Sequence, residues 1–342
     1  MSGMIGKIQD KKIFSITIIP SSWCNFRCVY CYENDHYKIK NMITTSEMTK
    51  RIKLFLENNI KTGFFRKVHI RWYGGEPLLD FKTIIDIMDF TNSIGKTYKT
   101  DIIGEIITNG YLLDIVKFKI LLEKGVKIFQ VTIDGYKDAH DKLRPLLNGK
   151  PTFDKIFENL IQTRNVTDNF FMFIRSNVMP DNLDSIKKFL DLASNYFSRD
   201  RRYYFTFFPV TRSGGDNDKN LKVIEPKKRM EIIQELYMYA TQLGLNIPDK
   251  DTLLQIDGVP AMDDLCQALY PFSIIIRNDG KLFKCPLTVM IDDESVGHIE
   301  EDGSIVLDES KINRWAKYIL SPLSRGCPRL HELGEVVGVE AE

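Results

Sequence analysis

The stretch Ser22-Trp-Cys24-Asn-Phe-Arg-Cys28-Val-Tyr-Cys31-Tyr32 decides how the rest of this 342-residue chain is interpreted. Its cysteines stand at positions i, i+4 and i+7 of one short segment, so their thiolates can converge on a single centre. Structural zinc requires four ligands, usually as paired Cys-x-x-Cys motifs. A four-iron cube held by three cysteines keeps one iron open to a small molecule. The spacing favours an open [4Fe-4S] cluster, with zinc and a distant fourth ligand such as His36 as the alternative.

Strands and helices are predicted to alternate on the C-terminal side of this segment. The β-branched run Phe14–Ile19 immediately precedes the segment and predicts a strand that ends at Pro20. Apolar residues at helical spacing follow, for example between Met48 and Ile60. Further runs predict strands at 68–72, 104–108, 127–133, 170–175 and 203–208. Such alternation predicts an α/β fold with parallel strands, either a doubly wound sheet or a full or partial barrel.

The composition excludes several classes of protein. Hydrophobic residues make up 43% and charged residues 27% of the chain, which excludes a largely disordered protein. The 47 basic and 46 acidic residues leave a net charge of +1, so neither nucleic acid nor a membrane surface is an expected partner. Neither a signal peptide nor an apolar run of membrane-spanning length is present. We therefore expect a cytoplasmic protein whose clustered thiols bind metal rather than form disulfides.

The three-cysteine segment also carries a family resemblance. Cys-x-x-x-Cys-x-x-Cys with the aromatic Tyr30 before the last cysteine, placed after the first strand, resembles the radical SAM superfamily. The resemblance implies that Cys24, Cys28 and Cys31 hold a [4Fe-4S] cluster whose open iron binds S-adenosylmethionine (SAM). It also implies reductive cleavage of SAM to a 5′-deoxyadenosyl radical that abstracts hydrogen from a substrate. The implied core is a partial (β/α)6 TIM barrel, and Tyr30 is an expected cofactor contact.

The end of the second predicted strand carries matching chemistry, as expected for a barrel whose active site lies where strands end. In Trp72-Tyr-Gly-Gly-Glu-Pro77, two glycines allow close backbone approach to a ligand, and a carboxylate can accept bonds from an ammonium group. The segment resembles the Gly-Gly-Glu-Pro motif of the family, which holds the methionyl amino group. The SAM contacts expected here are Gly74, Gly75, Glu76 and Pro77.

Polar residues also stand at the ends of the next three strands. A hydroxyl and a guanidinium are suited to binding a carboxylate, and the resemblance implies that Thr132 and Arg144 hold the SAM carboxylate. Asn109, in Thr-Asn-Gly, is another expected cofactor contact. Arg175 and Asn177 are expected on the ribose and adenine side.

No catalytic acid or base is assigned. Asp134 and Glu105 are candidates for substrate or proton handling, and each can equally serve as a loop cap.

The remaining cysteines lie in the last quarter of the chain. Cys266-x13-Gly280-x4-Cys285 resembles the opening of SPASM and twitch auxiliary-cluster domains, and a hairpin turning at Asn-Asp-Gly280 would bring both thiols to one site. Cys327 resembles the start of a SPASM cysteine run, but no later cysteine follows it. We expect at most one auxiliary [4Fe-4S] cluster, on Cys266, Cys285 and Cys327, with an open or non-cysteine fourth position such as His331. A degenerate domain with buried thiols is the alternative.

These observations predict an N-terminal extension (1–13), a radical SAM core (14–240) and an incomplete SPASM-like or twitch domain (241–342). The motif combination resembles the peptide-modifying branch, so the expected function is a peptide maturase that acts on a peptide or protein and takes electrons from a flavodoxin or ferredoxin. A first strand near residue 14 leaves no room for a preceding leader-recognition domain. The alternatives are an anaerobic sulfatase-maturating enzyme and a non-catalytic iron–sulfur or zinc protein.

Overall fold

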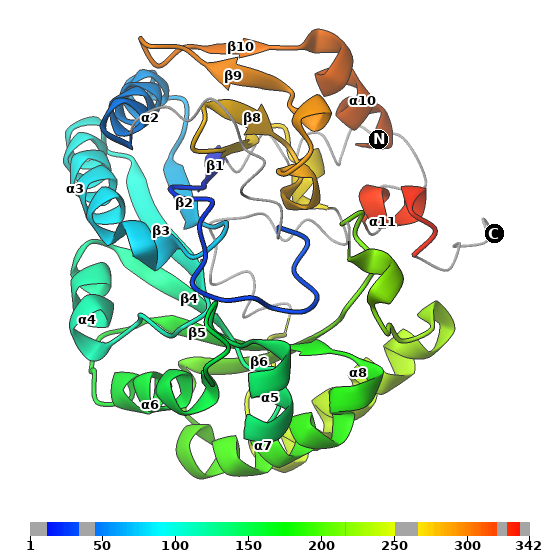
Figure 1. Ribbon diagram of the computed structural model, residues 1–342. Coiled ribbons are helices and arrows are strands. Elements are labelled where there is room, and N and C mark those ends of the chain that lie inside the picture. Colours follow the sequence, from blue (N-terminus) through cyan, green and yellow to red (C-terminus); the bar gives the residue numbers. More distant parts are fainter. Residues whose placement is uncertain (1–11, 34–44, 216, 250–265, 320–326, 336–342) are drawn as a thin grey trace.

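The fold is built around six parallel strands that neighbour one another in chain order (Figure 1). The computed structural model describes residues 12–33, 45–215, 217–249, 266–319 and 327–335. The core strands are β1 (Ile13–Ile18), β2 (Lys67–Trp72), β3 (Asp101–Thr108), β4 (Val126–Thr132), β5 (Phe171–Val178) and β6 (Tyr203–Pro209). All six predicted strands are confirmed, and the parallel order gives the predicted partial (β/α)6 barrel.

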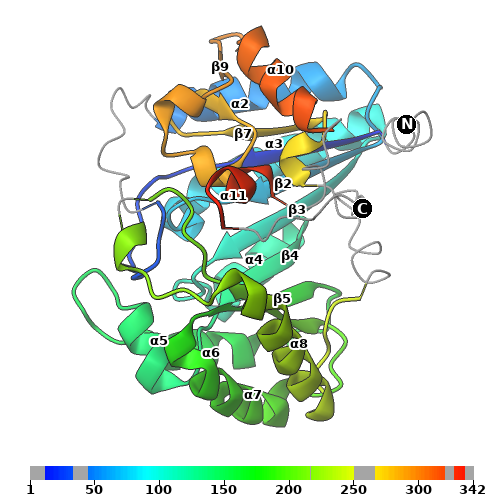
Figure 2. The same cartoon turned by 90° about the vertical axis from the view of Figure 1, so that its right-hand side faces the viewer.

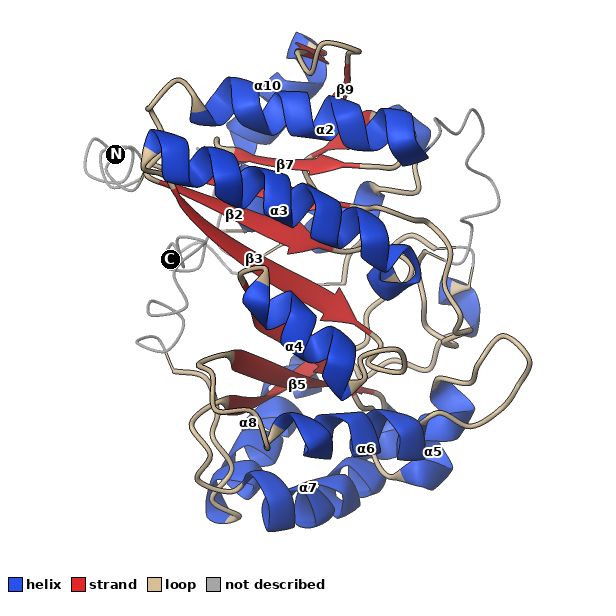
Figure 3. Ribbon diagram, turned by 90° about the vertical axis from the view of Figure 1, so that its left-hand side faces the viewer, coloured by secondary structure: helices blue, strands red, loops and turns tan. Residues whose placement is uncertain are grey.

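Helices cover the outer face of this curved sheet (Figure 3). Those that follow the first three strands lie side by side across it, and their neighbours continue the layer around β4 to β6. They are α2 (Thr45–Ile60), α3 (Phe81–Tyr98), α4 (Ile115–Glu123), α5 (Lys137–Leu143), α6 (Phe153–Thr163), α7 (Leu183–Phe197) and α8 (Pro226–Gln242).

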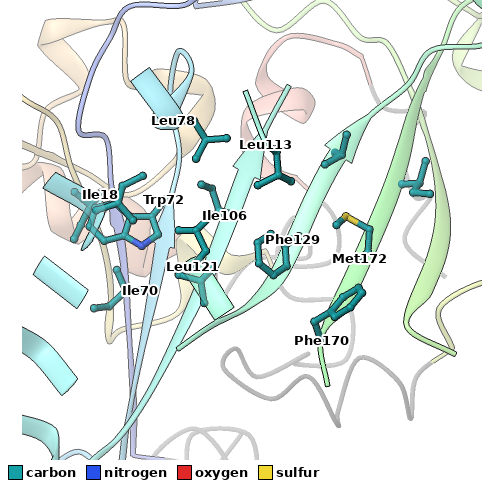
Figure 4. Close-up of a cluster of buried hydrophobic side chains, with 14 of the residues drawn as sticks. Ile18, Ile70, Trp72, Leu78, Ile106, Leu113, Leu121, Phe129, Phe170 and Met172 are labelled. Atoms are coloured by element: carbon teal, nitrogen blue, oxygen red, sulfur yellow. The ribbon is translucent and has the colours of Figure 1, made fainter. Parts of the chain in front are cut away.

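The alternation of side chains along each strand separates a hydrophobic core from a polar inner face. Ile70 and Trp72 of β2 point outward into the helix layer and are fully buried. Figure 4 shows this layer, in which Phe129 of β4 packs against α4 with its ring 4.6 Å from that of Phe118. His69 and Arg71 alternate with these apolar residues on β2, so they belong to the inner face, where the strand ends gather.

The C-terminal part extends the same sheet. Strand β7 (Ser273–Ile276) pairs in parallel with β1, and β8 (Lys281–Phe283) returns antiparallel to it, as the hairpin at Asn278-Asp-Gly280 predicts. Strands β9 (Gly297–Ile299) and β10 (Ile305–Leu307) complete a ten-stranded sheet. Helices α10 (Glu309–Ile319) and α11 (Pro328–Glu332) follow, and Figure 2 shows α11 between the C-terminal strands and α8. Helix α8 spans the boundary predicted at residue 240.

No helix among the described residues is both long and apolar enough to cross a lipid bilayer.

Candidate SAM and cluster site

The three-cysteine loop is fixed by the connection between α5 and α6. Phe26 forms an isolated antiparallel bridge with Leu146 and is almost fully buried. The backbone N–H groups of Arg27 and Val29 donate to the carbonyls of Pro145 and Leu143, at 2.9 and 3.0 Å. Cys24, Cys28 and Cys31 are free, partly buried thiols on this pinned loop. The loop is therefore shaped by contacts that do not involve its thiols.

Without a bound metal centre, the three thiols of this loop are difficult to ionise. Burial raises the pKa of Cys24 to about 12 and also raises the pKa values of Cys28 and Cys31. A bound metal centre supplies the positive charge that buried thiolates need. Among the described residues, no three Cys, His, Asp or Glu side chains converge closely enough to hold one metal ion. A four-iron cube distributes its thiolates over separate iron atoms, so this donor set fits a cluster better than a single zinc ion.

The alternative fourth zinc ligand, His36, lies outside the described residues.

The Gly-Gly-Glu-Pro turn packs against the same loop. A side chain at Gly75 would place its Cβ 2.3 Å from the carbonyl oxygen of Trp23, and its φ of +48° also favours glycine. The N–H of Gly75 donates to Glu33 Oε2 at 2.9 Å, and the N–H of Glu76 donates to the Trp23 carbonyl at 2.8 Å. The close backbone approach expected from the glycines thus occurs, at least in part, toward the protein's own cluster loop.

Glu76 joins the ends of two strands. Its side chain is fully buried, and its oxygens accept from the Thr108 hydroxyl and the Asn109 N–H, both at 2.7 Å, and from the Leu78 N–H at 2.9 Å. Burial raises its pKa, although these three donors act in the opposite direction. The Asn109 amide in turn donates to Asn25 Oδ1 at 2.8 Å. Both residues therefore support the cluster loop, and their contact with SAM stays a prediction.

Tyr30 bonds to three other candidate site residues. Its hydroxyl donates to Asp134 Oδ2 and accepts from Arg144 Nη1 at 2.6 Å and from Asn177 Nδ2 at 2.9 Å. Burial raises the pKa of Tyr30, so the hydroxyl stays protonated and able to donate. Asp134 is fully buried, and burial raises its pKa although Arg144 nearby acts to lower it. The hydroxyl network was not foreseen, because the motif specifies only an aromatic residue here.

The two arginines have different neighbours. Arg144 stacks over the ring of Phe26 at 5.6 Å, and its buried Nε finds no hydrogen-bond partner among the described residues. Arg175 lies opposite Thr132 in the register of β4 and β5, and its Nε donates to Asn177 Oδ1 at 2.9 Å. Arg175 is therefore the strand neighbour of Thr132, and the prediction that Thr132 and Arg144 hold the SAM carboxylate stays a prediction.

Thr206 is a residue that sequence reasoning missed. It lies opposite Arg175 in the register of β5 and β6. Its hydroxyl is buried and has no hydrogen-bond partner within the described part of the chain. The row Thr132, Arg175, Thr206 thus crosses three neighbouring strands on the inner face.

Glu105 is a paired carboxylate. Its Oε2 lies 2.8 Å from Arg71 Nε and 2.9 Å from His69 Nε2. Burial alone would raise its pKa, but Arg71 and His69 outweigh burial and lower it to about 2. A carboxylate held ionised in this way is unsuited to exchanging protons near neutral pH.

Two of the three C-terminal cysteines, Cys266 and Cys327, meet although they lie 61 positions apart in the chain. The Cys266 thiol donates to the sulfur of Cys327, which raises the pKa of Cys266 and lowers that of Cys327 to about 6. Cys285 interacts electrostatically with Cys327, and burial raises its pKa to about 12. The side chain of His331, the suggested fourth ligand, lies outside the described side chains.

A buried lysine braces this second thiol group. Lys284 Nζ donates to the carbonyls of Tyr270 and Ser273, both at 2.7 Å, and burial lowers its pKa to about 7. Next to Cys266, the Gln267 amide donates to Ser15 Oγ at 3.1 Å and accepts from Arg71 Nη1. The second thiol group is thus tied to the inner face of the barrel through Arg71.

Comparison with known proteins decides the family. Residues 18–193, about half of the chain, match the model of the radical SAM superfamily. The chain belongs to the radical SAM superfamily. It is accordingly a radical SAM enzyme that uses a [4Fe-4S] cluster and SAM, and the non-catalytic alternative is set aside.

Two curated members of the superfamily resemble most of the chain. A cysteine-type anaerobic sulfatase-maturating enzyme of Clostridium novyi is 26% identical over 325 residues, which cover 89% of this chain and 81% of that protein. A GTP 3′,8-cyclase of Aliarcobacter butzleri is 26% identical over 269 residues, 78% of this chain and 73% of that protein.

Solved radical SAM structures share the fold. Native anSMEcpe with bound AdoMet has a TM-score of 0.65 at 18% identity, covering 96% of this chain and 92% of that one. SuiB of Streptococcus suis with bound S-adenosylmethionine has a TM-score of 0.61 at 14% identity, covering 98% and 78%. At these identities the likeness supports the partial barrel alone.

Proposed function

We propose that this radical SAM enzyme abstracts a hydrogen atom from a peptide or protein substrate and thereby matures it. The observation that carries the proposal is a second thiol group beside the barrel, in which Cys266 bonds to Cys327 and the adjacent Gln267 bonds to Ser15 and Arg71 of the core strands. A radical SAM core with a second thiol group is the arrangement that the sequence analysis associates with the peptide-modifying branch. Two structures of similar fold are complexes with peptides, anSMEcpe with Cp18Cys peptide and SuiB with the precursor peptide SuiA.

In this proposal Cys24, Cys28 and Cys31 hold the [4Fe-4S] cluster. When bound, the cluster and SAM together supply reductive cleavage of the sulfonium and a carbon radical that takes hydrogen from the substrate. The protein orients this chemistry by keeping its cluster loop rigid, through Glu76, Gly75 and the bridge at Phe26. An external electron donor of flavodoxin or ferredoxin type completes the reaction.

We assign the carboxylate of SAM to Thr132 and Arg175, because the register places them opposite each other on neighbouring strands. Arg144, whose Nε has no hydrogen-bond partner among the described residues, is the second guanidinium available for that carboxylate. Tyr30 and Asn177 lie on the adenosine side, joined by their hydrogen bond of 2.9 Å. The Gly74–Pro77 turn takes the amino group.

The division into a core of residues 14–240 and an auxiliary region of residues 241–342 belongs to the same proposal. The auxiliary region holds one cluster on its three cysteines, next to the core strand β1 through β7. This cluster contacts the substrate or accepts its electron.

The test is an anaerobic assay. Reconstituted protein is incubated with SAM and dithionite, and 5′-deoxyadenosine is measured with and without deuterated peptides. The peptides are those encoded beside the gene and the Cp18Cys peptide. Deuterium transfer from any of them into 5′-deoxyadenosine supports the proposal. Cleavage of SAM without transfer from any of them contradicts it.

Anaerobic sulfatase maturation is the second candidate. It is favoured by the similarity to the Clostridium novyi enzyme over 89% of this chain. It is disfavoured by the short cysteine set, because only three cysteines follow residue 31. Deuterium transfer from the Cp18Cys peptide, and from no peptide encoded nearby, would favour this candidate.

A further inference from the structure

The ten-stranded sheet ends in a short antiparallel hairpin, β9–β10. Strand β10 lies at the margin of the sheet in the order β10-β9-β8-β7-β1, and Figure 1 shows it along the outer border of the molecule. Within the described part of the chain, β9 is its single pairing partner. One side of β10 therefore presents an open strand edge.

The hydrogen bonds around β10 show which of its backbone groups face outward. Glu300 N–H donates to Ser304 O at 2.8 Å, and Asp308 N–H donates to Val296 O at 2.9 Å. In an antiparallel pair every second residue bonds to the partner, so Val306 bonds toward β9. The N–H and C=O groups of Ile305 and Leu307 consequently point to the open side.

The side chains of β10 are apolar and unusually exposed. Ile305, Val306 and Leu307 keep 36, 48 and 41% of their surface exposed. Natural edge strands are generally protected by being very short, by charged side chains, by proline, by a bulge or by a covering segment. Strand β10 is short, at three residues, but carries no charged side chain. Neither lysine nor proline occurs in β10, and its register with β9 is regular.

The chain segment that contains β10 is rich in carboxylates. Residues 297–310 contain Glu300, Glu301, Asp302, Asp308 and Glu309 but no lysine or arginine. The side chain of Glu301 is 84% exposed and lies 3.5 Å from Arg51, and that of Glu300 is 45% exposed and lies 2.8 Å from His298. Asp302, Asp308 and Glu309 add three further carboxylates, so negative charge predominates. Two copies of this hairpin would bring ten carboxylates together, so pairing with a second copy is disfavoured. An added strand that carries lysine or arginine would form backbone hydrogen bonds with the open edge and also favourable charge pairs with these carboxylates.

We propose that β10 binds an extended, basic segment of a peptide partner by strand addition. The proposal rests on the proposed peptide substrate, and it adds a contact outside the reaction site. Holding one segment there would raise the effective concentration of another segment at the strand ends. Four strand spacings, roughly 19 Å along the sheet, separate β10 from β1. An extended peptide therefore needs at least about six residues between the bound segment and the reacting one.

The test uses the full-length, reconstituted protein and a fluorescein-labelled peptide, Lys-Ile-Lys-Val-Lys-Ile-Lys, measured by anisotropy. Leu307→Pro removes one outward N–H and keeps the bonds to β9, whereas Leu307→Thr keeps that N–H. We expect Leu307→Pro to weaken binding at least tenfold and Leu307→Thr less than threefold. We also expect weaker binding when salt rises from 50 to 300 mM, and none of the matched Glu-Ile-Glu-Val-Glu-Ile-Glu peptide.

Hydrogen exchange of the wild-type protein gives a readout that does not depend on the proline variant folding. The basic peptide is expected to slow exchange at residues 305 and 307 and not at 306. The proposal would be overturned by unchanged affinity in a folded Leu307→Pro variant or by equal binding of the acidic peptide. It would also be overturned if the basic peptide did not slow exchange, or if the wild type were a dimer and the Leu307→Pro variant a monomer. Formation of 5′-deoxyadenosine is measured without either peptide, so these outcomes are separate from failure of the proposed function.

Discussion

The hydroxyl of Tyr30 lies between Asp134 and Arg144: it donates to the carboxylate and accepts from Arg144 Nη1 at 2.6 Å. The guanidinium and the carboxylate also form a direct, longer ion pair, with Arg144 Nη1 3.8 Å from Asp134 Oδ2. Tyr30 is thus a positioning residue that bridges this ion pair and ties Arg144 to the cluster loop.

Tyr30→Phe is therefore expected to weaken SAM binding by roughly tenfold, which corresponds to about 1.4 kcal/mol, because three hydrogen bonds that organise the site are lost. Equilibrium dialysis of anaerobically reconstituted protein with labelled SAM measures this change. The cluster ligands stay in place, so iron content should equal that of the wild type. Tyr32→Phe, which loses a bond to Tyr73 alone, is the matched control. Equal SAM affinity in Tyr30→Phe and wild type would refute the positioning role.

Gly75→Ala is expected to prevent normal cluster assembly. Its Cβ would meet the Trp23 carbonyl at 2.3 Å, and backbone atoms cannot yield as a flexible side chain can. A loss of about 2–3 kcal/mol in stability and a reduced iron content at the first site should follow. Gly149→Ala is the control, since its φ of +78° is similar but nothing lies within 4 Å of the added Cβ. Urea unfolding and iron analysis compare the two, and similar losses in both would contradict the account.

Because of Glu105, the free energy of unfolding is expected to change with pH in the acid range. Its pKa of about 2 lies below the usual value of 4.5, so the folded protein binds the proton more weakly than the unfolded chain does. The stabilisation, about 3 kcal/mol, is complete above about pH 4.5 and is lost as pH falls toward 2. Urea unfolding of the cluster-free wild type and of cluster-free Glu105→Gln measures their difference in free energy of unfolding. This difference should be constant near neutral pH and become smaller below pH 4.5. If this difference instead becomes larger on acidification, the pKa of Glu105 is not lowered by its ion pair.

Lys284→Met is expected to remove the auxiliary cluster selectively. The substitution leaves the carbonyls of Tyr270 and Ser273 without their buried donor, at a cost of about 1–3 kcal/mol each. Cys285 directly follows residue 284, so it would be displaced together with these carbonyls. Iron should fall from about eight to about four atoms per chain. Lys281→Met, three residues earlier and with a partly exposed ion pair to Asp292, should keep all the iron. Full iron content in Lys284→Met would disprove the bracing role.

Local sequence patterns were sufficient to predict the fold. Runs of β-branched and aromatic residues predicted all six core strands, and the Asn278-Asp-Gly280 turn predicted the β7–β8 hairpin. Strand β3 begins three residues earlier than predicted, at Asp101, because Asp101 and Ile102 pair with Lys67 and Val68 of β2. That pairing involves a distant strand, so the sequence around Asp101 does not indicate it.

The side-chain network of the site was less predictable. Motif spacing predicted that Glu76, Asn109 and Tyr30 gather at the strand ends, but not which partner each would bind. Tyr30 and Asp134 are 104 residues apart, and nothing in either segment specifies their contact. Lys284 was missed for the same reason, since a lysine beside a cysteine usually indicates an exposed charge.

The central claim is that Cys24, Cys28 and Cys31 hold a four-iron cluster that binds SAM directly. Electron paramagnetic resonance of reduced, anaerobically reconstituted protein tests it most directly. The account predicts a [4Fe-4S]+ signal that changes when SAM is added, and its loss in the Cys24→Ala/Cys28→Ala/Cys31→Ala variant. A cluster signal that SAM leaves unchanged, or one that survives in the triple variant and still responds to SAM, would contradict it.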